Sequence, residues 1–373
     1  MGPFATQLLA DLGADVIVIE DRRGDTNRSM GAGPHPQLSG VSLNLLRNKR
    51  SVGLDVRTDA GYEVLGRLVA TADVFVSNLR PGSRRRARIL HDDLRTFRPD
   101  LVYCAASGYR ADDERADAPA YDDVIQAGVA VPDLFERIGM PPVLAPTLIA
   151  DKTVGLMISN VVLAALFARE RTGAGADISL AMVEVMKAFV LAEHGAEAIP
   201  EPPLGPAGYA RILNPSRRPQ QTADGLISVL PYEAHHYEAI FRIGGRDDLI
   251  GDPRTASRRS RIANGESLYR DVAEIIRART TAEWVSIGRE AGIPMSAIAS
   301  LDDLLDELPL VEHPHAGAYR VLPPMTGATP SDATVRRPAP LQGEHNREVL
   351  TELGYADEEI DALAAADVLY AGV

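Results

Sequence analysis

Two patterns of apolar positions alternate along the first half of the chain. Apolar residues that recur every three or four positions predict amphipathic helices at residues 6–12 and 58–70. Runs of consecutive apolar, often β-branched residues predict buried strands at residues 16–20, 48–56, 73–78 and 101–109. Strands that alternate with helices form parallel sheets covered on both faces, so the pattern predicts an α/β fold.

The longest helical pattern follows Asp151. Its apolar residues share one helix face and lie at positions 154, 157, 158, 161, 162, 165 and 166. Arg169 and Arg171 fall in the expected last turn, and Gly173 can adopt the left-handed conformation that ends a helix. Asp151 therefore lies at or next to the helix start, where the helix dipole favours an ionised carboxylate. By spacing alone, an Asp at this place is ordinarily a helix cap.

The second half of the chain has a different organisation. Residues 201–219 are rich in Pro and Gly and predict a linker, as do residues 321–335. Between the two linkers, a strand at 226–230 and helices at 233–243, 268–278 and 282–291 predict a small α+β domain over residues 220–320. A last helix is expected to follow Gln342 and to end at Leu353.

Composition excludes several classes of protein. With 373 residues and a net charge of −13, the chain lacks the basic surface that nucleic-acid binding requires. We predict no membrane-spanning segment, because Ser159 and Asn160 interrupt the longest apolar helix. With a single cysteine, Cys104, and no secretory segment, the chain is expected to be cytoplasmic.

Motifs for the common cofactors and for hydrolases are missing from the sequence. There is no Gly-x-Gly-x-x-Gly run to hold a nicotinamide or flavin, and no Gly-x-Ser-x-Gly elbow. His235 and His236 are neighbours, so they point to different helix faces, and we expect no metal site.

Four ordered motifs carry a resemblance to a known family. Residues 120–127 read Ala-Tyr-Asp-Asp-Val-Ile-Gln-Ala, and residues 149–156 read Ile-Ala-Asp-Lys-Thr-Val-Gly-Leu. Residues 169–180 read Arg-Glu-Arg-Thr-Gly-Ala-Gly-Ala-Asp-Ile-Ser-Leu, and residues 343–346 read Gly-Glu-His-Asn. Together they resemble the class III CoA-transferases, which include formyl-CoA:oxalate transferase, carnitine CoA-transferase and α-methylacyl-CoA racemase.

The resemblance implies a fold, an assembly and a chemistry. The fold would be a Rossmann-like large domain built from residues 1–200 and 325–373 with a small middle domain, and two chains would form an interlocked homodimer. Asp151 would be the nucleophile, passing through a mixed anhydride and an aspartyl-CoA thioester. The substrates would be an acyl-CoA and a carboxylic acid, with no permanently bound cofactor. Backbone N–H groups at the helix start would stabilise the oxyanion.

The resemblance also assigns residues to CoA binding. They are Leu54, Asp55, Val56, Arg57, Asn78, Leu79, Arg80, Arg86, Tyr121 and Asp122. By composition alone, the basic cluster at residues 84–88 is either a solvated helix face or a clamp for the phosphates of CoA. Relatives place an Arg directly after the residue that matches Glu20, whereas Asp21 stands here, followed by Arg22 and Arg23.

Relatives also begin with a strand and a loop before the Gly2-Pro3-Phe4 motif, and that loop contacts CoA. We therefore expect either a start assigned too late or a genuinely short chain.

Three alternatives stay open. A 2-methylacyl-CoA racemase needs a second acid/base, which relatives supply as His at the position of Tyr121. Because the reference pKa of tyrosine is near 10, Tyr121 is a poor base at neutral pH and favours a transferase. A CoA-dependent dehydratase or lyase partner and a non-catalytic CoA-binding protein are the other two.

Overall fold

The computed structural model describes residues 1–325 and 335–372, and these form two compact units. The larger unit contains Met1–Val129, Leu144–Phe189 and Leu308–Val373, so both ends of the chain contribute to it. The smaller unit contains Ala130–Val143 and Val190–Glu307. Each unit is described by itself below.

These bounds differ from the predicted ones at three places. Residues 130–143 and 190–219 belong to the smaller unit, where Arg137 donates to Ala207 O and His194 Nδ1 accepts the N–H of Tyr209. Residues 308–320 belong to the larger unit, because Tyr319 packs in a core cluster with Leu38 and Leu43. Most of the predicted linker at 321–335 lies outside the described residues.

The larger unit contains two parallel sheets, where the sequence predicted one. Strand β1 (Val16–Glu20) pairs with β2 (Lys49–Gly53), and β4 (Val102–Ser107) pairs with both β3 (Val74–Ser77) and β5 (Ala176–Ala181). A short antiparallel hairpin follows late in the chain, from β9 (Leu310–His313) to β10 (Gly317–Arg320). Strand β5 was not predicted, because its apolar residues alternate with Asp177 and Ser179 in place of a continuous run.

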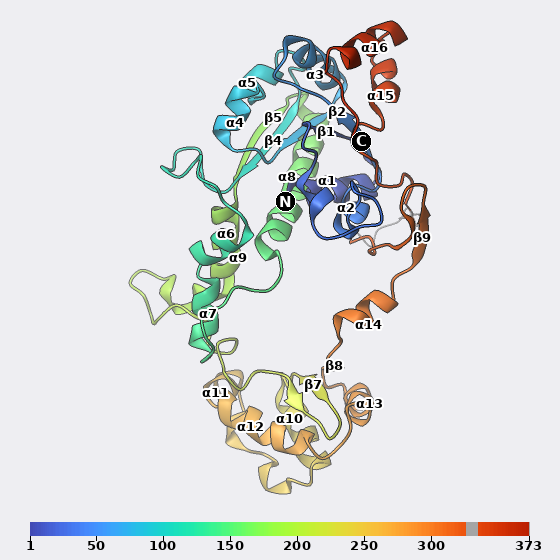
Figure 1. Ribbon diagram of the computed structural model, residues 1–373. Coiled ribbons are helices and arrows are strands. Elements are labelled where there is room, and N and C mark those ends of the chain that lie inside the picture. The colour runs from blue at the N-terminus through green and yellow to red at the C-terminus, as the bar shows by residue number, and fades with distance from the viewer. Residues whose placement is uncertain (326–334, 373) are drawn as a thin grey trace. The chain divides into compact units, whose positions relative to one another are not determined.

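Helices surround these sheets (Figure 1). The helices that precede β5 in the chain are α1 (Gly2–Asp11), α2 (Gly40–Leu45), α3 (Asp59–Thr71), α4 (Pro81–Arg86), α5 (His91–Leu94), α6 (Asp122–Gly128) and α8 (Ile149–Thr172). After it come α9 (Met182–His194), α15 (Asn346–Glu352) and α16 (Asp357–Ala365). Leu350 and Ile360 of the last two helices lie in the same core cluster as Val52 and Leu101.

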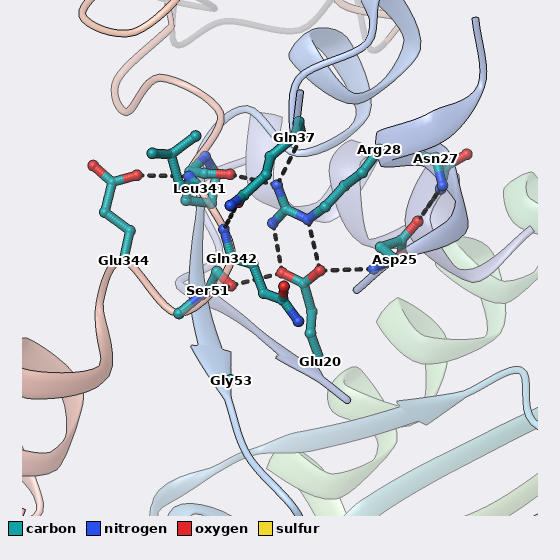
Figure 2. A network of polar contacts seen from close by, with 12 residues as sticks. Glu20, Asp25, Asn27, Arg28, Gln37, Ser51, Gly53, Leu341, Gln342 and Glu344 are labelled. Atoms are coloured by element: carbon teal, nitrogen blue, oxygen red, sulfur yellow. Dashed lines mark hydrogen bonds and ion pairs between the residues drawn. The ribbon is translucent and has the colours of Figure 1, made fainter. Parts of the chain in front are cut away.

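A buried polar network holds the C-terminal segment against the first sheet (Figure 2). Glu20, at the end of β1, accepts hydrogen bonds from Arg28 Nη2 at 2.5 Å, Ser51 Oγ at 2.6 Å and the N–H of Asp25 at 2.8 Å. Arg28 also donates to the carbonyl of Pro340 at 2.8 Å. These contacts explain why residues from both ends of the sequence belong to one unit.

Helix α8 corrects the prediction about membranes. By length and composition alone it is long and apolar enough to cross one, despite Ser159 and Asn160. Core helices of globular proteins meet the same criterion when they are mostly buried; in α8 33% of the apolar window is buried, where the helix packs against α1, α6 and β4. Its polar residues are used inside the unit, since Ser159 donates to Ala5 O and Arg169 forms an ion pair with Asp73.

The smaller unit has its own sheet and its own core. Its antiparallel sheet contains β6 (Gln220–Gln221), β7 (Leu226–Val229) and β8 (Met295–Ala297). Its helices are α7 (Val131–Arg137), α10 (Ala234–Ile243), α11 (Arg258–Ala263), α12 (Gly265–Ile276), α13 (Thr281–Ala291) and α14 (Leu301–Asp306) (Figure 1). The predicted helices at 233–243, 268–278 and 282–291 are confirmed as α10, α12 and α13. Trp284 is fully buried, and its indole N–H donates to Ile276 O at 2.7 Å.

Candidate active site

Asp151 lies in the first turn of α8 but does not cap it. The helix begins at Ile149, its cap position is Leu148, and it ends at Gly173 in the predicted left-handed conformation. The N–H of Asp151 donates to Asp122 Oδ2 at 2.8 Å, so a carboxylate from α6 does what a capping side chain would do. The ordinary interpretation of Asp151 as a cap is therefore wrong, because its carboxylate makes no capping hydrogen bond to this helix.

A buried pair of side chains holds the approach to this helix. Gln126 is fully buried and donates to Asp122 Oδ1 at 2.6 Å, one helical turn away. Its side-chain oxygen accepts the N–H of Ala145 at 2.8 Å, and its amide also lies 3.4 Å from the carbonyl of Thr147. The Pro-rich segment before α8 is thus fixed to α6, and this fixes where Asp151 stands.

The start of α1 reaches the Asp151 carboxylate. The backbone nitrogen of Met1 donates to Asp151 Oδ1 at 3.0 Å, and the Asp151 side chain is 31% exposed. This approach requires Gly155, one turn along α8, because a Cβ there would lie 2.8 Å from the Phe4 ring and 3.1 Å from Met1 O. A glycine inside a helix costs stability, and here the close contact explains it.

A buried lysine anchors the same end of α1. Lys49, on β2, donates from Nζ to Pro3 O at 2.8 Å and to Thr6 Oγ1 at 2.9 Å. Complete burial lowers the pKa of Lys49 to about 7. A neutral amine still donates two hydrogen bonds, so the anchor does not depend on the charge.

Two strand ends complete the surroundings of Asp151. Asn78, after β3, lies against the start of α1, since a Cβ on Gly2 would be 3.0 Å from Asn78 Oδ1. Gly108, after β4, lies against Ala120, since a Cβ there would be 2.2 Å from that of Ala120. The next residue, Tyr121, is 78% exposed. Residues from five places in the sequence therefore meet at the carboxyl ends of parallel strands, where α/β proteins bind ligands.

Much of the segment 54–57, which the resemblance assigns to CoA binding, is engaged by contacts inside the larger unit. The Leu54 side chain is buried, and its N–H donates to Glu20 O. The N–H of Asp55 donates to Val368 O, and the hydrogen bond from Arg57 lowers the pKa of the Asp55 carboxyl. The exposed Arg57 is the side chain of this segment best able to bind a ligand. Asp122 is buried and positions α8 by accepting the N–H of Asp151.

The basic cluster is split between the core and the surface. Arg84 is buried, and its Nε has no hydrogen-bond partner in residues 1–325 and 335–372, whereas Arg86 is exposed and donates to Ser83 Oγ at 3.0 Å. Arg80 is exposed and donates to Asp117 O at 2.9 Å, and Leu79 beside it is 49% exposed. The exposed Arg86 is therefore compatible with both interpretations of the cluster, a solvated helix face and a clamp for the phosphates of CoA.

Several residues of this site were not found from the sequence. They are the backbone nitrogen of Met1, the side chains of Lys49 and Gln126, and Gly155, which lacks a side chain at the close contact with α1. Two of them left a signal, since Gln126 follows Asp122 by four residues and Gly155 follows Asp151 by four. Over residues 1–325 and 335–372, no cluster of three or more His, Cys, Asp or Glu side chains could hold a metal ion.

Comparison with known proteins gives one consistent result. The family model for CoA-transferase family III matches residues 1–346. The chain is 30% identical over 372 residues to the probable fatty acyl-CoA transferase Rv3272 of Mycobacterium tuberculosis, covering 92% of both proteins. It is 26% identical over 378 residues to succinyl-CoA:glutarate CoA-transferase of Mus musculus, covering 99% of this chain and 87% of that protein.

Solved structures agree with the sequence relatives. A crystal structure of a variant of Rv3272 matches with a TM-score of 0.77 and 27% identity, covering 92% of this chain and 93% of that one. A CAIB/BAIF family protein from Brucella suis matches with a TM-score of 0.76 and 25% identity, covering 94% and 95% of the two chains.

Proposed function

This chain is a member of CoA-transferase family III, and we propose that it exchanges CoA between an acyl-CoA and a free carboxylic acid with Asp151 as the nucleophile. The observation that carries the proposal is the state of the Asp151 carboxylate. It lies at the positive end of a long helix and is partly exposed; its Oδ1 forms an ion pair with the Met1 nitrogen at 3.0 Å, and its Oδ2 has no partner in the part of the chain that the structure describes. Such a carboxylate can still attack a carbonyl carbon.

The chemistry uses two kinds of acyl intermediate on one residue. A carboxylate oxygen of Asp151 attacks the thioester carbonyl, the C–S bond breaks, and CoA leaves as the thiolate. The thiolate then attacks the Asp151 carbonyl of the mixed anhydride, which releases the donor acid and leaves an aspartyl-CoA thioester. The acceptor carboxylate repeats the two steps in reverse order. No water or net proton is consumed, and each barrier is lower than that of a direct exchange.

We propose that backbone N–H groups at the helix start stabilise the developing oxyanion, as the resemblance implies. The N–H of Asp151 itself donates to Asp122, and that of Ile149 donates to Thr147 O. The Met1 nitrogen lies 3.0 Å from Asp151 Oδ1, whereas the first negative charge develops on the thioester oxygen of the substrate.

For CoA itself we propose contacts with the exposed side chains at this edge. Asn78, Leu79, Arg80 and Arg86 follow β3, and Tyr121 follows the segment beside β4. Guanidinium groups suit the phosphates of CoA, and Tyr121 can pack against the pantetheine arm or donate to the thioester oxygen. Arg57 is a further candidate for a phosphate contact.

We also propose that the chain works as a homodimer. Large apolar side chains are exposed on one face of α8, at Leu156, Leu163 and Phe167, and on α9, at Phe189 and Leu191. Exposed apolar groups of this size on neighbouring turns are typical of a protein interface. Light scattering after size-exclusion chromatography should give twice the chain mass of 40.1 kDa.

The alternatives receive less support. A racemase needs a base across the α-carbon from Asp151, and the exposed Tyr121 would have to act far below the ordinary pKa of a phenol. A non-catalytic CoA-binding protein is favoured by the departure at Asp21, where relatives carry Arg, whereas several relatives carry transferase names.

The test is to incubate the protein with a panel of acyl-CoAs and carboxylic acids and to follow the product CoA esters by mass spectrometry. Relatives named for glutarate, mesaconate and oxalate make dicarboxylic acids the first acceptors to try. Formation of a new CoA ester supports the proposal. Exchange of the α-hydrogen of 2-methylacyl-CoA in deuterated water, without formation of a new ester, would instead establish the racemase.

A further inference from the structure

A cavity lies wholly inside the smaller unit, separate from the residues around Asp151. It is small, about 30 Å³, opens to solvent, and is lined by α10, α11, the start of α12 and the segment around Arg211. Three arginines, Arg211, Arg258 and Arg261, line it, and the described residues of its lining include no Asp or Glu. The chain has a net charge of −13, so a cavity lined by three arginines is a positively charged site in an acidic protein.

The arginines are only partly engaged by the protein. Among the residues that the structure describes, Nη2 of Arg211 is buried without a hydrogen-bond partner, while its guanidinium carbon lies 4.1 Å from the centre of the Tyr232 ring. Arg258 makes a long hydrogen bond of 3.3 Å to the Tyr209 hydroxyl. Arg261 alone is neutralised, by Glu233 at 2.9 Å. A buried guanidinium nitrogen with no acceptor is costly, so the site has unused capacity for an anion.

Neutral donors complete the lining. Gly265 is the first residue of α12, a helix of 12 residues, so the N–H groups of that first turn lack helical partners. Tyr237 and Tyr269 also line the cavity, and burial raises the pKa of both phenols, which therefore stay protonated at neutral pH. Hydroxyl and backbone donors beside arginines match the acceptor oxygens of an oxyanion.

We propose that this cavity binds the oxyanion group of a small molecule, a carboxylate or a phosphate, between Arg211 and Arg258. The guanidinium of Arg211 lies over the Tyr232 ring, which limits its movement, and it can make a forked contact with an oxyanion. The inference does not rest on the chemistry of Asp151, because every residue involved belongs to the smaller unit.

The test is isothermal titration calorimetry of the full chain with sodium succinate and with sodium phosphate, at constant ionic strength. Arg211→Gln and Arg258→Gln should each weaken binding by at least about 10-fold, since each removes one charged donor. Arg259→Gln is the matched control, because Arg259 is exposed on the same short helix α11 but does not line the cavity. It should bind within about 2-fold of the unmodified protein.

The outcomes distinguish a carboxylate site, a phosphate site and the absence of an anion site. Tighter binding of succinate identifies a carboxylate source, and tighter binding of phosphate a phosphate source, provided that Arg211→Gln weakens it. If neither anion binds up to about 20 mM, or if Arg259→Gln weakens binding as much as Arg211→Gln, the cavity is not an anion site. Thermal unfolding of each variant checks that it is folded. Arg211→Lys keeps the charge but not the forked pair of donors, so its affinity for the anion should lie between that of the unmodified protein and that of Arg211→Gln.

Discussion

Two carboxylates of the larger unit, Glu20 and Asp151, have opposite surroundings. Glu20 is 3% exposed, and both its oxygens accept hydrogen bonds from Arg28, with further donors at Ser51 and Asp25 (Figure 2). Asp151 is 31% exposed and accepts one hydrogen bond from the described residues, from the Met1 nitrogen. Around Asp151 the other polar groups bind each other, as Asp122 and Gln126 do.

The difference separates a structural carboxylate from a reactive one. When every lone pair of an oxygen is used, attack on a carbonyl first requires breaking strong, charge-assisted hydrogen bonds. Where the scaffold binds the backbone N–H and one side-chain oxygen keeps no partner among the described residues, that oxygen stays nucleophilic and the position of the carboxylate stays fixed. Removal of each carboxylate should therefore have opposite consequences for stability and for activity.

The largest expected effect is on activity. Asp151→Asn should lower the rate of CoA transfer by about 10³-fold or more, because the amide cannot form the acyl intermediates. CoA affinity measured by calorimetry and the free energy of unfolding should change little, since the amide is nearly isosteric. The matched control is Asp123→Asn, an exposed acid on α6, which should keep most of the activity. Full activity of Asp151→Asn would rule out its role as nucleophile.

The reverse is expected at Glu20. Glu20→Gln should lower the free energy of unfolding by about 3 kcal/mol, because it leaves the buried Arg28 without its counter-charge. Glu63→Gln, which breaks an exposed pair with Arg67, should cost under about 0.5 kcal/mol. Urea denaturation monitored by circular dichroism measures both. Equal losses in the two variants would show that the network in Figure 2 has no special weight.

The Glu20 contribution should also depend on pH with a defined sign. Burial by itself raises the pKa of Glu20, but the hydrogen bonds and charge of Arg28 outweigh it and bring the pKa below its ordinary value. The carboxylate therefore stabilises the fold above the unfolded pKa, near 4.5, and this contribution is lost as the pH falls through the lower folded pKa. The stability difference between the unmodified protein and Glu20→Gln should thus be constant from about pH 6 upward and shrink on acidification.

A smaller effect is expected from the residue that places Asp151 without touching substrate. Gln126→Ala removes the ties from Asp122 to the segment before α8, so kcat should fall by about 10- to 100-fold while KM for acyl-CoA changes less than about 3-fold. Steady-state kinetics of the folded variant gives both values. An unchanged kcat would mean that the helix start holds its position without Gln126.

The sequence was sufficient for what is local or periodic. The runs at 16–20 and 101–109 became β1 and β4, and the stop at Gly173 was found from residue type alone. The prediction that Asp151 stands near a helix start also followed from spacing. The mixed α/β fold with parallel sheets, likewise predicted, agrees with the matched structures.

Contacts between distant segments could not be predicted in this way. No pattern shows that the nitrogen of Met1 reaches Asp151, that Lys49 holds α1, or that Val368 binds Asp55, because each contact depends on how the sheets and helices pack. The buried face of α8 shows why a hydropathy argument about membranes fails: Ser159 is satisfied by backbone carbonyls and disrupts nothing.

Two arginines differ in the same way as the two carboxylates, and the smallest expected effect is that of changing the exposed one, Arg86. Arg28 is buried and bound to Glu20, whereas Arg86 is exposed and donates a single hydrogen bond to Ser83. Arg86 is therefore free to meet a phosphate of CoA, and Arg86→Ala should raise KM for acyl-CoA by about 3- to 10-fold with kcat unchanged, because binding of the nucleotide is equal in ground and transition states. Substrates that lack the nucleotide, such as an acyl-pantetheine, should be unaffected. Arg95→Ala, an exposed arginine paired with Asp92, serves as the control for loss of one surface charge. If both variants shift KM equally, or neither does, Arg86 belongs to a solvated helix face and not to the CoA site.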